Sequence, residues 1–193
     1  MKFSQTFKFA QTFNKQRGVS MIEVAIWAVI AGVIAIAVMN MYNPIRSGQS
    51  ASTLGDRTLV MVSDIQKFWT RANDYSTVTA EEINKLGLVR SPLKYDAGVM
   101  YDAYGNQMAL NGSRISFALT LGGTEAPLSS DDCATIITRL EPVAQSIRIG
   151  TSAEAAAGAI TGGNVYKSGS TVSQTGLTAG CGEANTKIAA QFR

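Results

Sequence analysis

The interval between Arg17 and Arg46 constrains the fold of this chain more than any other segment. It carries a single charged residue, Glu23, and residues 24–39 are apolar throughout. At a rise of about 1.5 Å per residue, a helix over residues 19–42 is about 36 Å long, and the hydrocarbon core of a bilayer is about 30 Å thick. Because basic residues precede this segment, we expect its N-terminal side to stay in the cytoplasm and the remaining chain to be exported.

Three interpretations of this apolar segment compete. A cleaved secretory signal would use residues 24–34 as its apolar region and Ala35-Ile36-Ala37 as an A-x-A cleavage site, releasing a secreted domain that starts near Val38. An uncleaved membrane anchor would need only the length of the apolar run. The third interpretation also accounts for the residues just before the run.

Those residues are Gln16-Arg17-Gly18-Val19-Ser20-Met21-Ile22-Glu23, a basic patch that ends in glycine, with a carboxylate five residues past the glycine. Here the chain resembles a type IV pilin precursor. The resemblance implies that a membrane aspartic peptidase, the prepilin peptidase, cuts between Gly18 and Val19 on the cytoplasmic side and methylates the new amino group of Val19. Glycine suits this position because it lets a recessed active site approach the backbone closely.

Glu23 is the informative residue of this string. A carboxylate in an apolar helix costs about 2.5 to 3.5 kcal/mol at the bilayer centre and less near the interface, so it needs a partner. Cleavage creates one, the ammonium of Val19, either in the same chain or in a neighbouring subunit, and the resemblance favours the neighbour. The first helical turn also favours an anion. The alternative is a chance acid at the end of an anchor, extending to the lipid headgroups.

The leader of residues 1–18 and Val19 as the first mature residue resemble class b pilins, because class a pilins start with phenylalanine after a very short leader. Class a chains also carry a kinking proline where this chain has Asn40. Pro44 is expected to break or kink the helix, and Gly32 costs about 1 kcal/mol of helix propensity. The resemblance implies that the helix can stretch or melt at Gly32 and Pro44 when subunits pack into a fibre. Alternatively, Gly32 permits close helix packing.

The sequence therefore predicts an α+β chain with a cleaved leader (1–18), a transmembrane and assembly helix (19–46) and an exported globular head (47–193). After a polar break at residues 47–52, an amphipathic pattern predicts a second helix over 53–73. This second helix is expected to pack on an antiparallel β-sheet. The resemblance implies that the apolar helix, the second helix and the sheet together make up the type IV pilin fold.

Capping signals place two further helices in the head. Thr79 with Glu82 predicts a helix over 79–86, and Ser129 or Ser130 begins another that ends at Leu140. Strand patterns over residues 100–101, 107–110 and 115–121 predict an antiparallel meander. Two further strands are expected over residues 146–149 and 187–192, and the last can return to the sheet. Turns are expected at Gly105-Asn106 and Asn111-Gly112, and turns and small strands of low intrinsic order over 150–182. Residues 102–106 are similar to the aromatic-glycine turn of class b pilins but depart from it at Asp102 and Ala103.

The chain has two cysteines, Cys133 and Cys181, which are too few for a four-thiolate cluster and do not form a C-x-x-C pair. A single disulfide is what remains. The exported compartment is oxidising, so this bond should persist. The alternative is two buried free thiols.

Composition argues against catalysis. The chain has no histidine, which excludes Ser-His-Asp triads, Cys-His dyads and His-ligated zinc sites. The adjacent acids Glu81-Glu82 and Asp131-Asp132 fit helix caps, and neighbours on a helix diverge by about 100°. The glycines match no nucleotide-binding loop. We therefore expect no enzyme activity, no cofactor and no metal site.

Net charge argues against nucleic acid. There are 17 basic and 14 acidic side chains, but residues 1–18 hold Lys2, Lys8, Lys15 and Arg17 without any acid, so the rest is nearly balanced. Phosphate-binding surfaces need clustered cations.

The expected function is that of a structural subunit of a type IVb pilus, for adhesion, aggregation or conjugative mating. The resemblance implies these partners: further copies of the chain, the prepilin peptidase, the inner-membrane assembly platform and minor pilins. The precursor would lie in the inner membrane of a Gram-negative-type bacterium and the mature chain in an extracellular fibre, with residues 111–129 and the glycine-rich region facing outward. Alternatives are a minor pilin or a type II secretion pseudopilin, and a signal-anchored or secreted binding domain.

Overall fold

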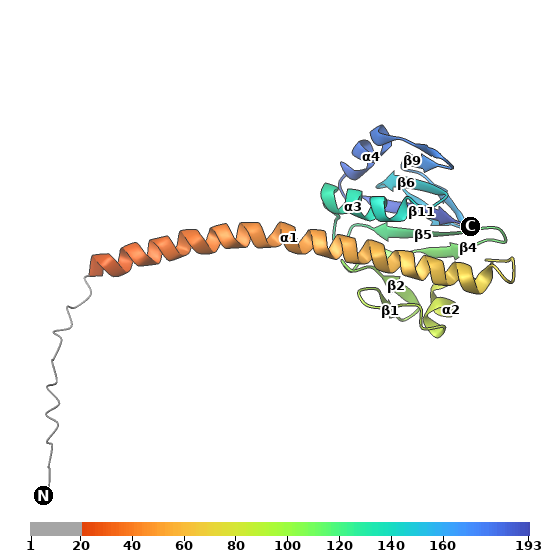
Figure 1. Ribbon diagram of the computed structural model, residues 1–193, viewed down its shortest axis with the longest axis horizontal. Coiled ribbons are helices and arrows are strands. Elements are labelled where there is room, and N and C mark those ends of the chain that lie inside the picture. The colour runs from red at the N-terminus through yellow and green to blue at the C-terminus, as the bar shows by residue number, and fades with distance from the viewer. Residues whose placement is uncertain (1–20) are drawn as a thin grey trace, which may run out of the picture. The chain divides into compact units, whose positions relative to one another are not determined.

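Helix α1 (Met21–Trp69) is the first element of the computed structural model, which describes residues 21–193 and, within α1, the side chains outside residues 39–47 (Figure 1). The chain divides into two compact units between Tyr42 and Asn43. In the first unit the described residues belong to α1 alone. The second unit, called the head below, contains the rest of α1 and all other elements.

The polar break predicted in the first helix is wrong. Helix α1 continues through Pro44 and residues 47–52, and it ends at Trp69 rather than at residue 73. A proline in a helix removes one hydrogen bond, but the ladder resumes after it. Ala51 and Leu54 are fully buried in the head core, so tertiary packing holds a stretch whose polar composition alone predicted a loop.

The two predicted capped helices are confirmed. In α2 (Ala80–Lys85) the Thr79 hydroxyl accepts from the Glu82 N–H at 3.3 Å, and in α3 (Ser130–Leu140) the Ser129 hydroxyl accepts from the Asp132 N–H at 3.1 Å. A fourth helix, α4 (Gln174–Cys181), lies in the glycine-rich region and was not predicted. Its cap is Ser173, whose hydroxyl accepts from the Gly176 N–H at 3.2 Å.

The main sheet of the head has six antiparallel strands in the order β10-β9-β6-β11-β5-β4. These strands are β4 (Leu110–Gly112), β5 (Phe117–Gly122), β6 (Ser146–Gly150), β9 (Asn164–Ser168), β10 (Thr171–Val172) and β11 (Lys187–Phe192). A second sheet contains β1 (Lys94–Asp96), β2 (Val99–Tyr101) and β3 (Gln107–Met108), and a two-stranded ribbon contains β7 (Glu154–Ala156) and β8 (Ala159–Thr161).

The predicted meander is confirmed in its neighbouring pairs but not as one sheet. Strand β2 pairs with β3 and β4 pairs with β5, but β2 and β3 belong to a separate sheet, and β5 also pairs with the C-terminal β11. Asn111 and Gly112 lie inside β4, and the turn to β5 falls at residues 113–116. Ile115 is consequently outside the strand, with 63% of its surface exposed. The apolar alternation was real, but it did not fix where the chain turns.

Helix α3 and the head portion of α1 lie over one face of the main sheet, and the core fills the space between them (Figure 1). The fully buried large side chains include Leu54, Met61, Ile65, Ile83, Met100, Phe117, Leu119, Leu121, Ile136, Ile137, Leu140 and Phe192. Close approach of the two helices depends on Gly55, because a Cβ there would lie 2.9 Å from the Cβ of Arg139. Phe117 stacks on Phe192 with ring centroids 5.3 Å apart.

Candidate functional site

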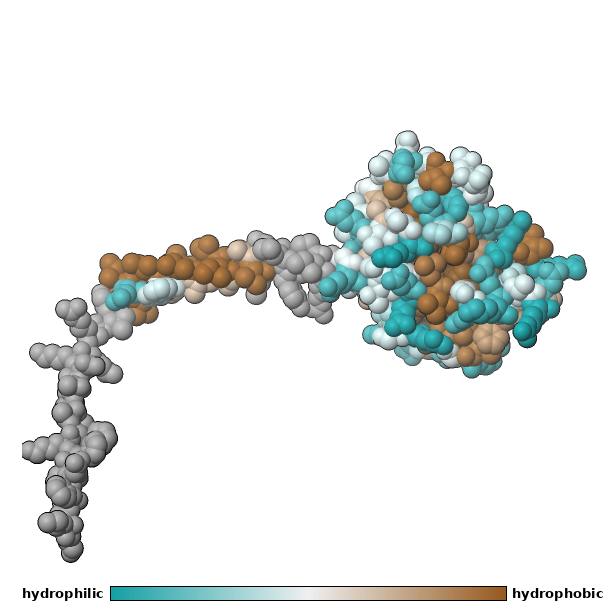
Figure 2. Space-filling view, viewed as in Figure 1, coloured by the Kyte–Doolittle hydropathy of each residue, from teal (hydrophilic) through white to brown (hydrophobic). Residues whose placement is uncertain are grey.

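The apolar part of α1 is the first candidate site. Residues 21–38 form the helix, among those described, that is long and apolar enough to cross a membrane, a criterion of length and composition that a cleaved signal sequence also meets. All of its side chains are exposed within the chain, for example Met21 at 91% and Trp27 at 65%, and its surface is almost continuously apolar (Figure 2). A helix that is hydrophobic on all sides has to be buried in lipid or in other protein.

Glu23 interrupts this surface. It lies in the first turn of α1, where the partial positive charge of the helix end favours an anion. No ion pair joins it to a residue in the described range 21–193. The carboxylate is thus a single negative group at the end of an apolar helix.

The other residues predicted for assembly are placed only in part. Gly18 and Val19, the predicted cleavage and methylation site, lie outside the described residues. Gly32 lies in α1 with nothing within 4 Å of the position that a Cβ would take. Pro44 lies within α1, and its side chain is outside what the structure describes.

The predicted disulfide is present. Cys133 in α3 and Cys181 at the end of α4 are joined with an S–S distance of 2.04 Å, and both are buried. The hydroxyl of Ser130 donates to the Cys181 carbonyl at 2.9 Å, which adds a second link between the two helices. The bond therefore ties the glycine-rich region to the helix that covers the sheet.

Asp102 organises the turn between β2 and β3. Its carboxylate is 2% exposed and accepts four hydrogen bonds. The donors are Tyr104 N–H (2.9 Å), Asn106 N–H (2.9 Å), Asn106 Nδ2 (3.3 Å) and Gly122 N–H (3.0 Å). Asn106 in turn exchanges hydrogen bonds with the N–H and C=O of Ala126, at 2.9 and 2.8 Å. Asp102 and Asn106 therefore link the turn between β2 and β3 to the end of β5 and to Ala126, in the segment before α3.

Tyr104 from the same turn is held by a second carboxylate. Burial raises the pKa of Tyr104, and the nearby Asp132 carboxylate, a hydrogen-bond partner of the phenol, raises it further. The phenol therefore stays protonated and remains a donor at alkaline pH. The turn and the start of α3 are in this way connected through a hydrogen bond between Tyr104 and Asp132.

Glu183 forms a comparable centre after α4. Its carboxylate accepts from the N–H and hydroxyl of Thr151, at 2.7 and 2.9 Å, and from the amide of Asn164 at 2.8 Å. The N–H of Thr151 is the largest cause of the lowered pKa of Glu183, followed by the Thr151 hydroxyl. Burial acts in the opposite direction.

Sequence reasoning missed both centres. Asp102 was noted only as a departure from a family turn, although an Asp before Gly-Asn is a common signal for a turn that its own side chain stabilises. No local signal pairs Glu183 with Thr151, because the contact depends on the sheet. Among the described residues, no group of three or more Cys, Asp or Glu side chains is arranged to hold a metal ion.

Comparison with known proteins identifies the fold. No family model matches the chain, and no curated protein matches it. Among solved structures, the crystal structure of TcpA, a type IV pilin from Vibrio cholerae El Tor biotype, is similar with a TM-score of 0.50 and 16% sequence identity, over 77% of this chain and 99% of that chain.

The chain thus has the fold of a type IV pilin: an apolar N-terminal helix, a continuation of that helix packed on an antiparallel sheet, and one disulfide.

Proposed function

We propose that this chain is the precursor of a structural subunit of a type IVb pilus, cut after Gly18 and polymerised through the helix of residues 19–46. The observation that carries the proposal is the exposed apolar surface of residues 21–38, with Glu23 as its single charge, in a chain with a pilin fold. Such a helix fits storage in a membrane and burial in the core of a fibre.

The assembly step replaces lipid around the helix by the helices of other subunits. Cleavage would give Val19 a free amino group, which is then methylated, and the Glu23 carboxylate of one subunit would pair with the Val19 ammonium of its neighbour. A buried charge without its partner costs about 3 to 5 kcal/mol. Only the axial stagger that forms this pair is therefore favourable. Gly32 and Pro44 are the places where the helix is proposed to adjust to that stagger.

The partners implied are other copies of the chain, the prepilin peptidase, an inner-membrane assembly platform and minor pilins. The precursor would reside in the inner membrane and the mature subunit in an extracellular fibre used for adhesion, aggregation or conjugative mating. The disulfide-closed C-terminal half distinguishes the chain from a small major pseudopilin, whereas a minor pilin has the same N-terminal design.

The first test is the mature N-terminus of material sheared from producing cells. The proposal predicts fibres by electron microscopy whose subunits begin at N-methylated Val19. A chain that begins near Val38 and stays monomeric would show ordinary signal cleavage and overturn it.

The second test is Glu23→Val, compared with Glu23→Gln and with Glu81→Gln as a control at an exposed carboxylate of α2. We expect the two Glu23 variants to lower fibre yield at least about tenfold, because each leaves the Val19 ammonium unpaired. Glu81→Gln should leave the yield unchanged. Wild-type yield with Glu23→Val would refute the pairing while leaving the fold assignment intact.

A further inference from the structure

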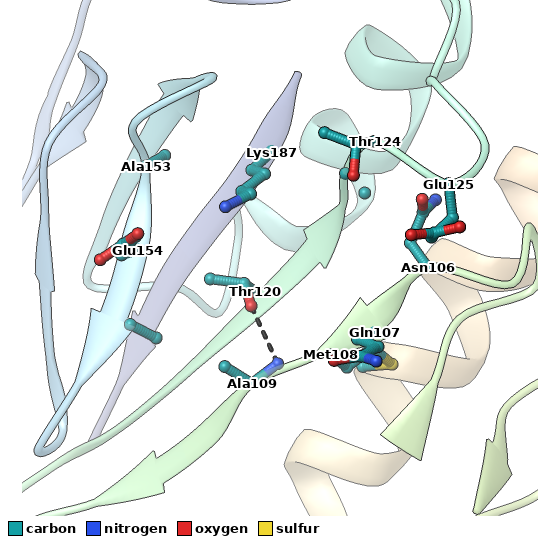
Figure 3. A pocket seen from close by; sticks show the side chains of 13 residues that line it. Asn106, Gln107, Met108, Ala109, Thr120, Thr124, Glu125, Ala153, Glu154 and Lys187 are labelled. Atoms are coloured by element: carbon teal, nitrogen blue, oxygen red, sulfur yellow. Dashed lines mark hydrogen bonds between the residues drawn. The ribbon is translucent and has the colours of Figure 1, made fainter. Parts of the chain in front are cut away.

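A cleft of about 500 Å³ opens on the face of the main sheet that α1 does not cover (Figure 3). It lies beside the end of the ladder between β4 and β5, whose last backbone hydrogen bond runs from the Thr120 N–H to the Ala109 carbonyl at 2.9 Å. The N–H of Ala109 donates to the Thr120 hydroxyl at 2.9 Å, and the N–H of Gly122 is taken by Asp102. Beyond this point β3 and β5 belong to different sheets. Such a volume lies within the range of sites that bury small ligands, about 300 to 1,000 Å³.

The cleft has a mostly polar lining and a charged rim. Asn106, Gln107, Thr120 and Thr124 line it together with Ala109, and three charged side chains surround it. Figure 3 shows Lys187 and Glu154 on one side and Glu125 beside Asn106 on the other. Within residues 21–193, none of the three charged groups forms an ion pair or a hydrogen bond. Two carboxylates against one ammonium leave the rim with a net negative charge.

The turn of residues 113–116, which precedes β5, carries a charge opposite to that of the cleft rim. Arg114 and Ile115 occupy its two central positions, and both are exposed, Ile115 by 63%. Arg114 forms no ion pair with a described residue. Asp74 has a lowered pKa, caused first by hydrogen bonds from Ser76 and last by the charge of Arg114. The tip therefore presents one cation and one large apolar side chain.

This tip is rigid because its flanking serines are hydrogen-bonded. The N–H and hydroxyl of Ser113 donate to the Ser116 carbonyl at 2.7 and 3.0 Å, and the Ser116 hydroxyl donates to the Gly158 carbonyl at 2.8 Å. Gln191 donates to the same Gly158 carbonyl at 2.8 Å. A preorganised protrusion loses little conformational entropy when it binds.

We propose that in the fibre the Arg114-Ile115 tip of one subunit inserts into the polar cleft of another, where the Arg114 guanidinium pairs with the Glu125 carboxylate and Ile115 lies beside Thr124. Tip and cleft lie at opposite ends of β5, about 17 Å apart at about 3.4 Å per residue. Because the tip cannot reach the cleft of its own molecule, the cleft that it enters belongs to a second copy. A contact between two different surfaces of the same chain is heterologous, and such a contact builds an open filament wherever its rotation does not close a ring. This inference rests on the proposed function.

Cysteine crosslinking tests the contact directly. Full-length chains carrying Ile115→Cys and Thr124→Cys are assembled into fibres, sheared and mildly oxidised. We expect a ladder of disulfide-linked multimers on non-reducing gels. The control pair, Ile115→Cys with Val172→Cys on the exposed edge strand β10, should give no ladder. A ladder from the control and none from the test pair would overturn the contact.

Charge reversal gives a test that is independent of crosslinking geometry. Arg114→Glu should reduce fibre yield about fivefold, the effect of about 1 kcal/mol per contact, and Glu125→Arg in the same chain should restore it. Arg90→Glu, at an exposed site outside both surfaces, is the control. Normal fibres from Arg114→Glu without a ladder from the cysteine pair refute the contact but not the pilus. Absence of fibres from the wild-type chain refutes both proposals.

Discussion

Removing the Asp102 carboxylate is expected to destabilise the head strongly, because this group holds the turn between β2 and β3. Asp102→Ala deletes the acceptor of four hydrogen bonds, and it leaves the buried N–H groups of Asn106 and Gly122 without a partner. Each buried donor left unsatisfied costs about 1 to 3 kcal/mol. We therefore expect a loss of about 3 to 5 kcal/mol in the free energy of unfolding, a large part of the roughly 5 to 15 kcal/mol typical of a domain.

Asp102→Asn separates the hydrogen bonds from the shape of the side chain. Its oxygen can still accept from the backbone N–H groups of Tyr104 and Asn106, but its amide group faces the Gly122 N–H and the Asn106 side-chain amide, donor against donor. The cost should therefore be intermediate, about 2 kcal/mol. The assay is urea unfolding of the full-length chain in detergent micelles, followed by the fluorescence of the buried Trp69 in a Trp27→Phe background.

Asp96→Ala, at an exposed position of β1, is the matched control and should change the free energy of unfolding by less than about 0.5 kcal/mol. If Asp102→Ala costs less than about 1 kcal/mol, the turn is not held by this carboxylate and the reasoning is wrong.

Three other changes test the packing of the head. Glu183→Gln should destabilise the chain at neutral pH. Because the pKa of Glu183 is lowered in the folded chain, its carboxylate contributes to the free energy of unfolding above the ordinary pKa of 4.5, and this contribution is lost as the pH falls through the folded pKa. The unfolding curves of variant and wild type should therefore converge in acid. Converting Cys133 and Cys181 together to alanine opens a loop with a sequence separation of 48 and should cost about 4 kcal/mol in urea unfolding; a loss below about 1 kcal/mol would contradict this. Gly55→Val should lower the thermal midpoint, because its side chain collides with Arg139, whereas Gly48→Ala, with nothing within 4 Å, should leave it unchanged or raise it.

The sequence predicted those parts of the fold that are determined locally. The caps at Thr79 and Ser129 and the last strand follow from short patterns, and each is present. The disulfide is also present, and it was predictable because the chain has only two cysteines. Strand order could not be predicted, because β11 inserts between β5 and β6 from the far end of the chain. Helix α4 was hidden by its glycines: Gly176 and Gly180 lack side chains because the backbones of β9 and β6 pass close to them.

In the candidate site, too, the sequence predicts the features that depend on local composition and not those that depend on the arrangement of the sheets. Glu23 and the apolar run are visible in the sequence because membrane burial depends on composition along one helix. The cleft beside Lys187 is not visible, since it arises where two sheets diverge. The turn at Arg114-Ile115, which is proposed to enter the cleft, lies three residues after the predicted turn at Asn111-Gly112, because that dipeptide resembles a hairpin turn.

The most direct test of the account is a cryo-electron microscopy map of fibres sheared from producing cells, at a resolution that shows side chains. The account predicts that the Glu23 carboxylate of each subunit lies within about 4 Å of the Val19 nitrogen of an adjacent subunit. A map in which every Glu23 faces its own N-terminus, or a chain that still carries residues 1–18 within the fibre, would contradict it.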